Sequence, residues 1–160
     1  MADEASGNPG VRFPPPLLFV LPFFVAFLLR RRLPFRIVGA DDGPVWMQVT
    51  GLALVAVGLG LGYWALLNFW RARTNPLPHH SARALVVVAP YTFTRNPMYL
   101  GLICAYLGGA LVTNWAWPLL FLPVSLLVLK YYVIAREERY LRARFGVAYD
   151  DYCARVRRWV

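Results

Sequence analysis

Long uncharged stretches of a length that suits a bilayer alternate with short polar segments along most of the chain. Residues 45–70 contain no charged side chain and form the clearest helix candidate. A transmembrane helix needs about 20 apolar residues, so we expect a span at 46–70, with Trp46 and Trp70 as interfacial anchors. Gly58 and Gly62 would let another helix approach closely, although glycine is also common in membrane helices without this role.

The next uncharged stretch, residues 96–129, is too long for a single span. Residues 113–118, in its middle, contain an asparagine, two tryptophans and a proline. These residues are typical of a turn, a membrane interface and a helix start. The pattern therefore predicts a helical hairpin with arms at 97–113 and 117–135.

The first apolar segment, at about residues 14–30, is marginal as a span because prolines interrupt it. Three consecutive prolines and then Pro22 favour a kinked helix. Four arginines follow closely, and the sequence leaves two interpretations open: the segment does not cross fully, or the membrane tolerates the cluster on its outer face. These arginines are Arg30, Arg31, Arg32 and Arg36.

Composition and charge favour a membrane protein. The chain is 59% hydrophobic with a net charge of +9, whereas soluble domains are roughly 45–50% apolar. Excess basic charge suits either nucleic acid or anionic lipid. Here the basic residues lie beside long apolar runs, which favours membrane lipid as the partner and argues against nucleic acid. Of the 17 Lys and Arg residues, four lie in 71–95 and eight lie from Lys130 onward. The positive-inside rule therefore places both segments in the cytoplasm.

These patterns predict an all-α integral membrane protein with about four transmembrane helices, including a helical hairpin in its C-terminal half, followed by a cytoplasmic helical tail. Residues 1–13 are expected to form a disordered tail, and residues 14–160 a single domain. Gly146 is placed to end a helix. A second short helix would then carry an aromatic and apolar face made by Tyr149, Tyr152, Val156 and Trp159.

The first candidate for chemistry lies where the hairpin begins. Asn96 is a favoured helix N-cap and Pro97 suits the first helical position, with Arg95 just outside. Unpaired helix N–H groups beside a guanidinium suit an anion such as a carboxylate. The alternative is a helix cap whose arginine only touches lipid phosphate.

The second candidate is a pair of acidic residues in the helix expected at 131–145. Glu137 falls inside the apolar stripe of this helix, where a carboxylate is costly without a partner. Glu138 falls at the edge of the stripe and can pair with Arg142 four residues on. Glu137 is therefore the better functional candidate.

The cysteines and histidines predict no metal site and no disulfide. Cys104 lies in an apolar run and Cys153 in the tail, without metal-ligand or disulfide spacing. His79 and His80 are adjacent, and neighbours on an extended chain point apart. Their role stays unassigned.

Two strings of the chain resemble the isoprenylcysteine carboxyl methyltransferase and phospholipid methyltransferase superfamily, in its small bacterial form. The first is LVVVAPYTFTRNPMYLG at 85–101, and the second is REERYLRARFGVAYDDYCARVRRW at 136–159. A membrane hairpin separates them, as in that superfamily. Two departures are Asn96, where many relatives have histidine, and Ala89, where glycine is usual.

The resemblance implies a methyltransferase of the bacterial inner membrane that uses S-adenosylmethionine and has its active site facing the cytoplasm. The cofactor would bind between residues 74–99 and 136–160, and the acceptor would be the carboxylate, amine or thiol of a lipid-like or prenylated molecule. Arg95 and Glu137 are the expected catalytic residues. The expected cofactor contacts are Tyr91, Phe93, Arg95, Asn96, Pro97, Tyr99, Glu137 and Glu138.

Two other interpretations stay open. Sterol and steroid reductases resemble this superfamily in their C-terminal half and use NADPH. They commonly carry an acidic residue soon after the arginine motif, whereas Tyr99 is followed here by Leu-Gly-Leu. The other interpretation is a non-catalytic membrane scaffold of the same fold, against which the intact Arg95 and Glu137 argue.

Overall fold

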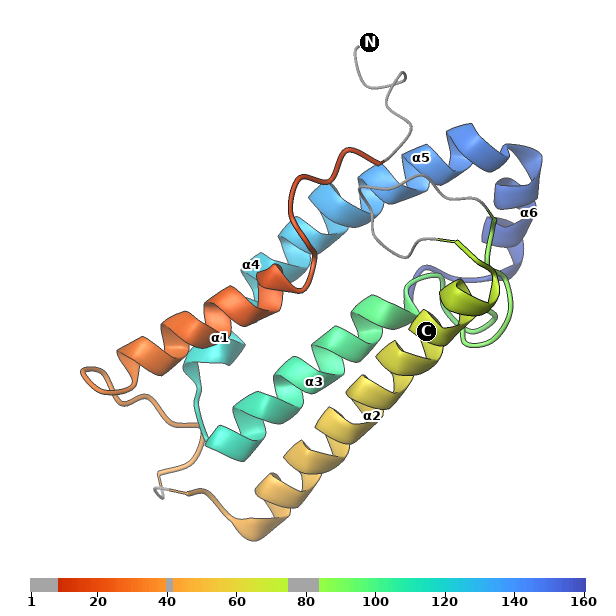
Figure 1. Cartoon of the computed structure of the whole chain (residues 1–160). Coiled ribbons are helices and arrows are strands. Elements are labelled where there is room, and N and C mark those ends of the chain that lie inside the picture. Colours follow the sequence, from red (N-terminus) through yellow and green to blue (C-terminus); the bar gives the residue numbers. More distant parts are fainter. Residues whose placement is uncertain (1–8, 40–41, 75–83) are drawn as a thin grey trace.

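The computed structural model describes residues 9–39, 42–74 and 84–160. Within these ranges the regular secondary structure is helical, and the extended pairing is a single isolated bridge between Arg36 and Trp115. The predicted all-α fold therefore holds for the described residues. The helices are α1 Leu17–Leu29, α2 Val45–Arg71, α3 Pro97–Thr113, α4 Trp117–Val128, the π-helix η1 Leu129–Ile134, α5 Ala135–Phe145 and α6 Val147–Arg155 (Figure 1).

Glycines bring α2 and α3 into close antiparallel contact. A Cβ on Gly58 would lie 2.5 Å from the Gly101 carbonyl oxygen, and one on Gly108 would lie 2.5 Å from that of Gly51. The two glycines on each helix are seven residues apart, so the helices meet on one face over about two turns. Gly62 has open space at its Cβ position, although its backbone nitrogen lies near Gly101. Gly58 is thus the closely packed member of the pair singled out in the sequence.

The hairpin between α3 and α4 turns at Asn114, whose φ of 53° ends α3 in the left-handed conformation. The side chain of Asn114 is buried, donates to the Val38 carbonyl at 2.9 Å and accepts from the Val38 amide at 3.0 Å. The loop after α1 therefore pairs with the hairpin turn. We call this end of the molecule, where α1 and α3 finish and α2 and α4 begin, the tip end.

The helix α1 packs against α3 and α4 and finishes at the tip end (Figure 1). The Ser125 hydroxyl donates to the Leu18 carbonyl at 2.7 Å, and Phe19 meets Tyr106 edge-on. Before the helix, Phe13 stacks on Tyr132 with a centroid distance of 5.3 Å. The arginines that follow α1 consequently lie at the tip end, away from the C-terminal tail (Figure 1).

Residues 9–13 pack against the domain, so its packed part begins before the predicted boundary at residue 14. Val11 is only 1% exposed, and Arg136 donates to the Gly10 carbonyl. The remainder of the predicted disordered tail, residues 1–8, lies outside the described residues.

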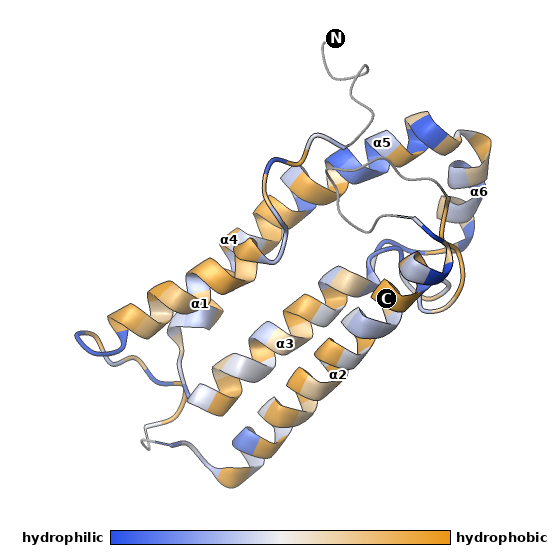
Figure 2. Cartoon of the chain, in the orientation of Figure 1, coloured by the Kyte–Doolittle hydropathy of each residue, from blue (hydrophilic) through white to orange (hydrophobic). Residues whose placement is uncertain are grey.

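Two helices of the described chain are long and apolar enough to cross a membrane, namely α2 and the continuous helix Trp117–Phe145. The helices α1 and α3 are apolar but shorter. Hydrophobic residues cover much of the outer surface of these helices, and hydrophilic ones gather in α5, α6 and the loops (Figure 2). Trp46 and Trp70, at the two ends of α2, are 66% and 56% exposed.

The second arm of the hairpin, predicted at 117–135, runs without a break into the helix expected at 131–145. It continues through η1 into α5 as one helix to Phe145. The π-turns of η1 bury Leu129, Val133 and Ile134 and change the register between the membrane arm and α5. At Gly146, with φ 54°, the chain turns into α6 as the sequence indicated.

Candidate active site

The candidate site forms where the segment before α3 meets the C-terminal end of the chain. Backbone hydrogen bonding joins the Arg95 amide to the Arg157 carbonyl at 2.9 Å. The Thr94 hydroxyl and the Asn96 side-chain amide both donate to the Arg158 carbonyl at 3.0 Å. Two segments about sixty residues apart in sequence are therefore fixed side by side, at the opposite end of α3 from the tip end.

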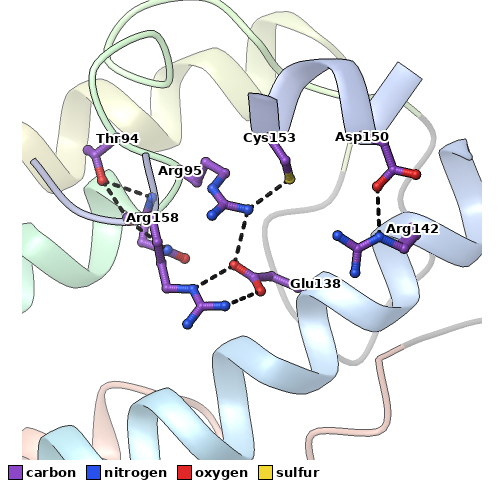
Figure 3. A network of polar contacts seen from close by, with 8 residues as sticks. Thr94, Arg95, Glu138, Arg142, Asp150, Cys153 and Arg158 are labelled. Carbon is purple, nitrogen blue, oxygen red and sulfur yellow. Dashed lines mark hydrogen bonds and ion pairs between the residues drawn. The ribbon is translucent and has the colours of Figure 1, made fainter. Parts of the chain in front are cut away.

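A carboxylate shared by two arginines lies at the centre of this junction. Arg158 binds Glu138 through Nε at 2.9 Å and Nη2 at 2.6 Å, and Arg95 approaches the same carboxylate at 3.3 Å (Figure 3). The side chains of Glu138 and Arg95 are 14% and 15% exposed, and that of Arg158 is 36% exposed. The hydrogen bond to Glu138 raises the pKa of Arg158. This two-pronged pairing is the strong form of an ion pair.

Arg95 also has hydrogen-bonding capacity that the described chain leaves unused. Its Nη1 atom donates to the Cys153 thiol at 2.8 Å, so the guanidinium lies between α5 and α6 (Figure 3). Its Nε atom is buried without a hydrogen-bond acceptor among the described residues. A buried donor of this kind is costly unless another group satisfies it.

Glu137 faces the start of α3. The Tyr99 hydroxyl donates to Glu137 Oε1 at 2.5 Å, which gives this carboxylate a partner from the other side of the site. Since Tyr99 lies in the first turn of α3, the contact links the hairpin's first helix to α5. The sequence placed Glu137 on the apolar face correctly, but a partner 38 residues away cannot be read from helical spacing.

Buried tyrosines complete the wall between the loop before α3 and α6. The Tyr152 hydroxyl donates to the Tyr91 carbonyl at 2.7 Å, and Phe69 meets the Tyr91 ring edge-on at 5.6 Å. Burial raises the pKa of Tyr91, and the nearby Tyr152 and Glu137 raise it further. Burial likewise raises the pKa of Tyr152. Both rings therefore remain neutral and offer an aromatic surface, on which the Tyr152 hydroxyl is fixed by the Tyr91 carbonyl.

Several sequence-predicted positions meet in this region, and one does not. Tyr91, Arg95, Tyr99, Glu137 and Glu138 share the contacts described above. Phe93, in contrast, is 64% exposed and stands apart from the buried cluster.

Two predicted local contacts are wrong. Asn96 does occupy the N-cap position before Pro97, but its side chain makes no cap and donates to the Arg158 carbonyl instead. Glu138 does not pair with Arg142, because Arg95 and Arg158 hold it. Arg142 bonds Asp150 of α6 at 2.7 Å.

Arg158 and Cys153 are site residues that the sequence did not indicate. Both lie in the tail string that carried the resemblance, but no spacing rule pointed to them. The one feature of the sequence that could have pointed to them was the periodic aromatic face of the tail helix. Its members Tyr149 and Tyr152 are buried, so α6 packs inward.

The described residues hold no group of three or more His, Cys, Asp or Glu side chains that could bind a metal ion. His79 and His80 lie outside the described residues, as does the rest of 75–83 within the expected cofactor region.

The protein is thus helical in the described residues, with two apolar helices of membrane-spanning length and a partly buried carboxylate–arginine cluster at one end. The family described as phospholipid methyltransferase matches residues 46–148, which is more than half of the chain. The chain belongs to this family of membrane methyltransferases, in agreement with the resemblance found in the sequence.

The other comparisons add little about activity. A Haemophilus influenzae protein named only as uncharacterized is 38% identical over 63 residues, which are 39% of this chain and all of that protein. No solved structure matches the chain.

Proposed function

We propose that this protein transfers a methyl group from S-adenosylmethionine to a lipophilic acceptor at the cytoplasmic face of the bacterial inner membrane. The single observation that carries the proposal is the partly buried junction of Arg95, Glu137 and Glu138, which draws together the two segments flanking the hairpin. The phospholipid named by the family makes a lipid amine the first acceptor to test. A carboxylate or thiol of a prenylated molecule is the second.

The side chains present fit this cofactor. Its carboxylate needs a buried cationic donor, and Arg95 offers Nε without an acceptor in the described chain. Its ammonium and ribose hydroxyls need carboxylates, which Glu137 and Glu138 supply. Its adenine and sulfonium suit aromatic rings, of which Tyr91 and Tyr99 lie nearest to these acids.

The bound cofactor supplies an already activated methyl group, so the chain's main task is alignment. Arg95 is held by Glu138 and by the thiol of Cys153, and this fixes where an anion binds. Tyr99 holds the Glu137 carboxylate in place. A protonated amine or a thiol must lose a proton before it attacks, and Glu137 is the carboxylate we assign to accept it. A carboxylate acceptor needs no such base.

The topology that suits this function has four spans, with α1 and α3 crossing beside the two longer helices. The chain from residue 9 onward then acts as one membrane domain. The site end, which carries most of the basic residues, faces the cytoplasm, and the lipid acceptor enters sideways from the bilayer. Labelling of single cysteines placed at residues 33 and 144 tests this arrangement, because the two positions should react from opposite sides.

Adenosylmethionine binding to the purified full chain tests the site. Arg95→Gln and Glu137→Gln should each weaken binding at least about tenfold, the loss that follows from removing one charge-assisted contact. Asp151→Asn is a matched control, since this exposed acid lies on the same tail outside the site. It should bind as the parent does.

The result that contradicts the proposal is equal affinity in the parent and both site variants. NADPH binding in place of adenosylmethionine would support the reductase interpretation instead. Binding without methyl transfer to any lipid extract, followed with labelled cofactor, would leave the chain a non-catalytic scaffold.

A further inference from the structure

A second polar site lies at the tip end, and the proposed methyl transfer does not use it. A pocket of about 470 Å³ opens there between the loop after α1, the start of α2 and the hairpin turn. Its volume falls in the range of roughly 300–1,000 Å³ that small-molecule sites occupy. The 17 residues of α3 separate it from the candidate active site by about 25 Å.

Positive charge dominates the lining of this tip-end pocket. Among the described residues, the lining contains three arginines, Arg30, Arg31 and Arg36, and one acid, Asp42. Neither Arg30 nor Arg31 has an ion pair or a hydrogen-bond acceptor for its guanidinium among the described residues. An excess of guanidinium groups around a cavity of this size suits an anion, and phosphate matches their planar donor geometry.

The arginine at the end of α1 is held in a defined position. The guanidinium of Arg30 lies over two aromatic rings, 4.5 Å from the centroid of Phe27 and 4.8 Å from that of Trp115. Stacking engages the face of the guanidinium, whereas its N–H donors point outward in the plane of the group. Arg30 is thus pre-oriented to donate to a ligand in the pocket.

The pocket wall is held by backbone pairing. The Ala116 amide donates to the Phe35 carbonyl at 3.0 Å, and the Ile37 amide donates to the Asn114 carbonyl at 3.3 Å. Together with the two side-chain bonds of Asn114 to Val38, they fix the loop that carries Arg36 against the hairpin turn. These hydrogen bonds therefore hold the residues that line the pocket in fixed positions.

The position of the pocket points to a lipid as the source of the anion. Gln48, in the first turn of the membrane-length α2, lines it, so it lies at a boundary of the apolar helices. Trp115 in its wall is a residue typical of the membrane interface. On α1, the exposed side chains of Phe24 and Leu28 lead away from the arginines along the apolar surface, where acyl chains would lie.

We propose that the tip-end pocket binds the phosphate-bearing headgroup of an anionic phospholipid, with Arg30 and Arg31 as its cationic donors. The site stands independently of the methyl transfer proposed above. It also gives a role to the arginine cluster that sits on the side opposite to most of the basic residues.

Lipid binding to the purified full chain in detergent, followed by native mass spectrometry, tests this site. The probes are phosphatidylglycerol, phosphatidylcholine of the same acyl chains, and inorganic phosphate alone. Phosphatidylglycerol should bind the parent more tightly than phosphatidylcholine. The Arg30→Gln/Arg31→Gln double variant should lose at least about tenfold of its phosphatidylglycerol affinity, as expected for removing two surface cations.

The matched control is Arg139→Gln/Arg144→Gln, which removes two exposed arginines from α5 at the other end and should change the affinity less than twofold. The exposed Arg31→Gln alone should give an intermediate loss if the double variant folds poorly. Equal binding of both lipids, or parent-like binding by Arg31→Gln and by the double variant, overturns the proposal. Inorganic phosphate binding as tightly as phosphatidylglycerol overturns the assignment to lipid.

Discussion

The two ends of α3 use arginine in opposite ways. At the site end, Arg95 and Arg158 share the carboxylate of Glu138 in a largely buried junction. At the tip end, Arg30 stacks on aromatic rings and has no acidic partner among the described residues. A guanidinium in a largely buried ion pair is stabilised by its carboxylate. A stacked guanidinium at an interface is stabilised by packing and by water or lipid. Removing charge should therefore disturb the first end far more than the second.

Glu138→Gln should have the largest effect. The substitution keeps the shape of the side chain but leaves Arg95 and Arg158 without their shared negative charge. Breaking a buried pair costs about 3–5 kcal/mol, and the partial exposure of Arg158 favours the lower end. We expect the free energy of unfolding in detergent to fall by about 3 kcal/mol, measured by denaturant titration, and adenosylmethionine binding to be lost.

Asp150→Asn is the control for this experiment, because it removes a carboxylate from an exposed ion pair of the same tail. It should leave unfolding unchanged. A Glu138→Gln variant as stable as Asp150→Asn would mean that burial does not distinguish the two pairs.

Asn114→Ala should have the next largest effect, at the tip end. It removes two side-chain hydrogen bonds from a fully buried position. It also places alanine, which tolerates the left-handed conformation less well than asparagine, at φ 53°. Each bond contributes about 1 kcal/mol, so a loss of about 2–3 kcal/mol is expected in the same titration. Asn114→Gly relieves the backbone strain only, and should recover about 1 kcal/mol of it. Equal losses of unfolding free energy in both variants would show that backbone strain at residue 114 does not contribute to the effect of alanine.

The sequence predicts the helices well because their signals are local. A run of apolar residues without charge marks α2. The helix α3 is marked by the proline at its start and the asparagine at its end. The π-turns of η1 leave no such signal, since the residues there are ordinary helix residues. The helix expected at 131–145 is present, but its continuity with the hairpin arm through these π-turns could not be predicted for this reason.

The same contrast applies to the site. Glu137 was found because an acid on an apolar face conflicts with helical periodicity. Arg158 was missed because its pairing with Glu138 depends on the turn at Gly146 and on how α6 folds back, which spacing does not encode. The local rule of pairing at four residues chose Arg142 for Glu138, and tertiary contacts overrode it.

Arg158→Gln should have a smaller effect than Glu138→Gln. Glu138 keeps Arg95 as its partner, and the lost arginine is 36% exposed, so solvent replaces part of the interaction. We expect a loss of about 1 kcal/mol in the denaturant titration. Adenosylmethionine binding should weaken several-fold, because Arg95 is then the remaining cation beside Glu138 and is less available to the cofactor carboxylate. Arg157→Gln, next in the chain, is the matched control. A loss of unfolding free energy as large as that of Glu138→Gln would show that Arg158, and not Arg95, provides most of the stabilisation of Glu138.

Arg142→Gln should have the smallest effect. Its Nε atom bonds Asp150 at 2.7 Å, a distance close to the 2.6 Å between Arg158 and Glu138. Both side chains are more than half exposed, however, so water competes for each charge and salt screens the pair. We expect no measurable change in unfolding at 0.15 M salt and none in cofactor binding. A destabilisation comparable to that of Arg158→Gln would mean that distance outweighs burial, and the contrast between paired and solvated arginines would then fail within a single tail.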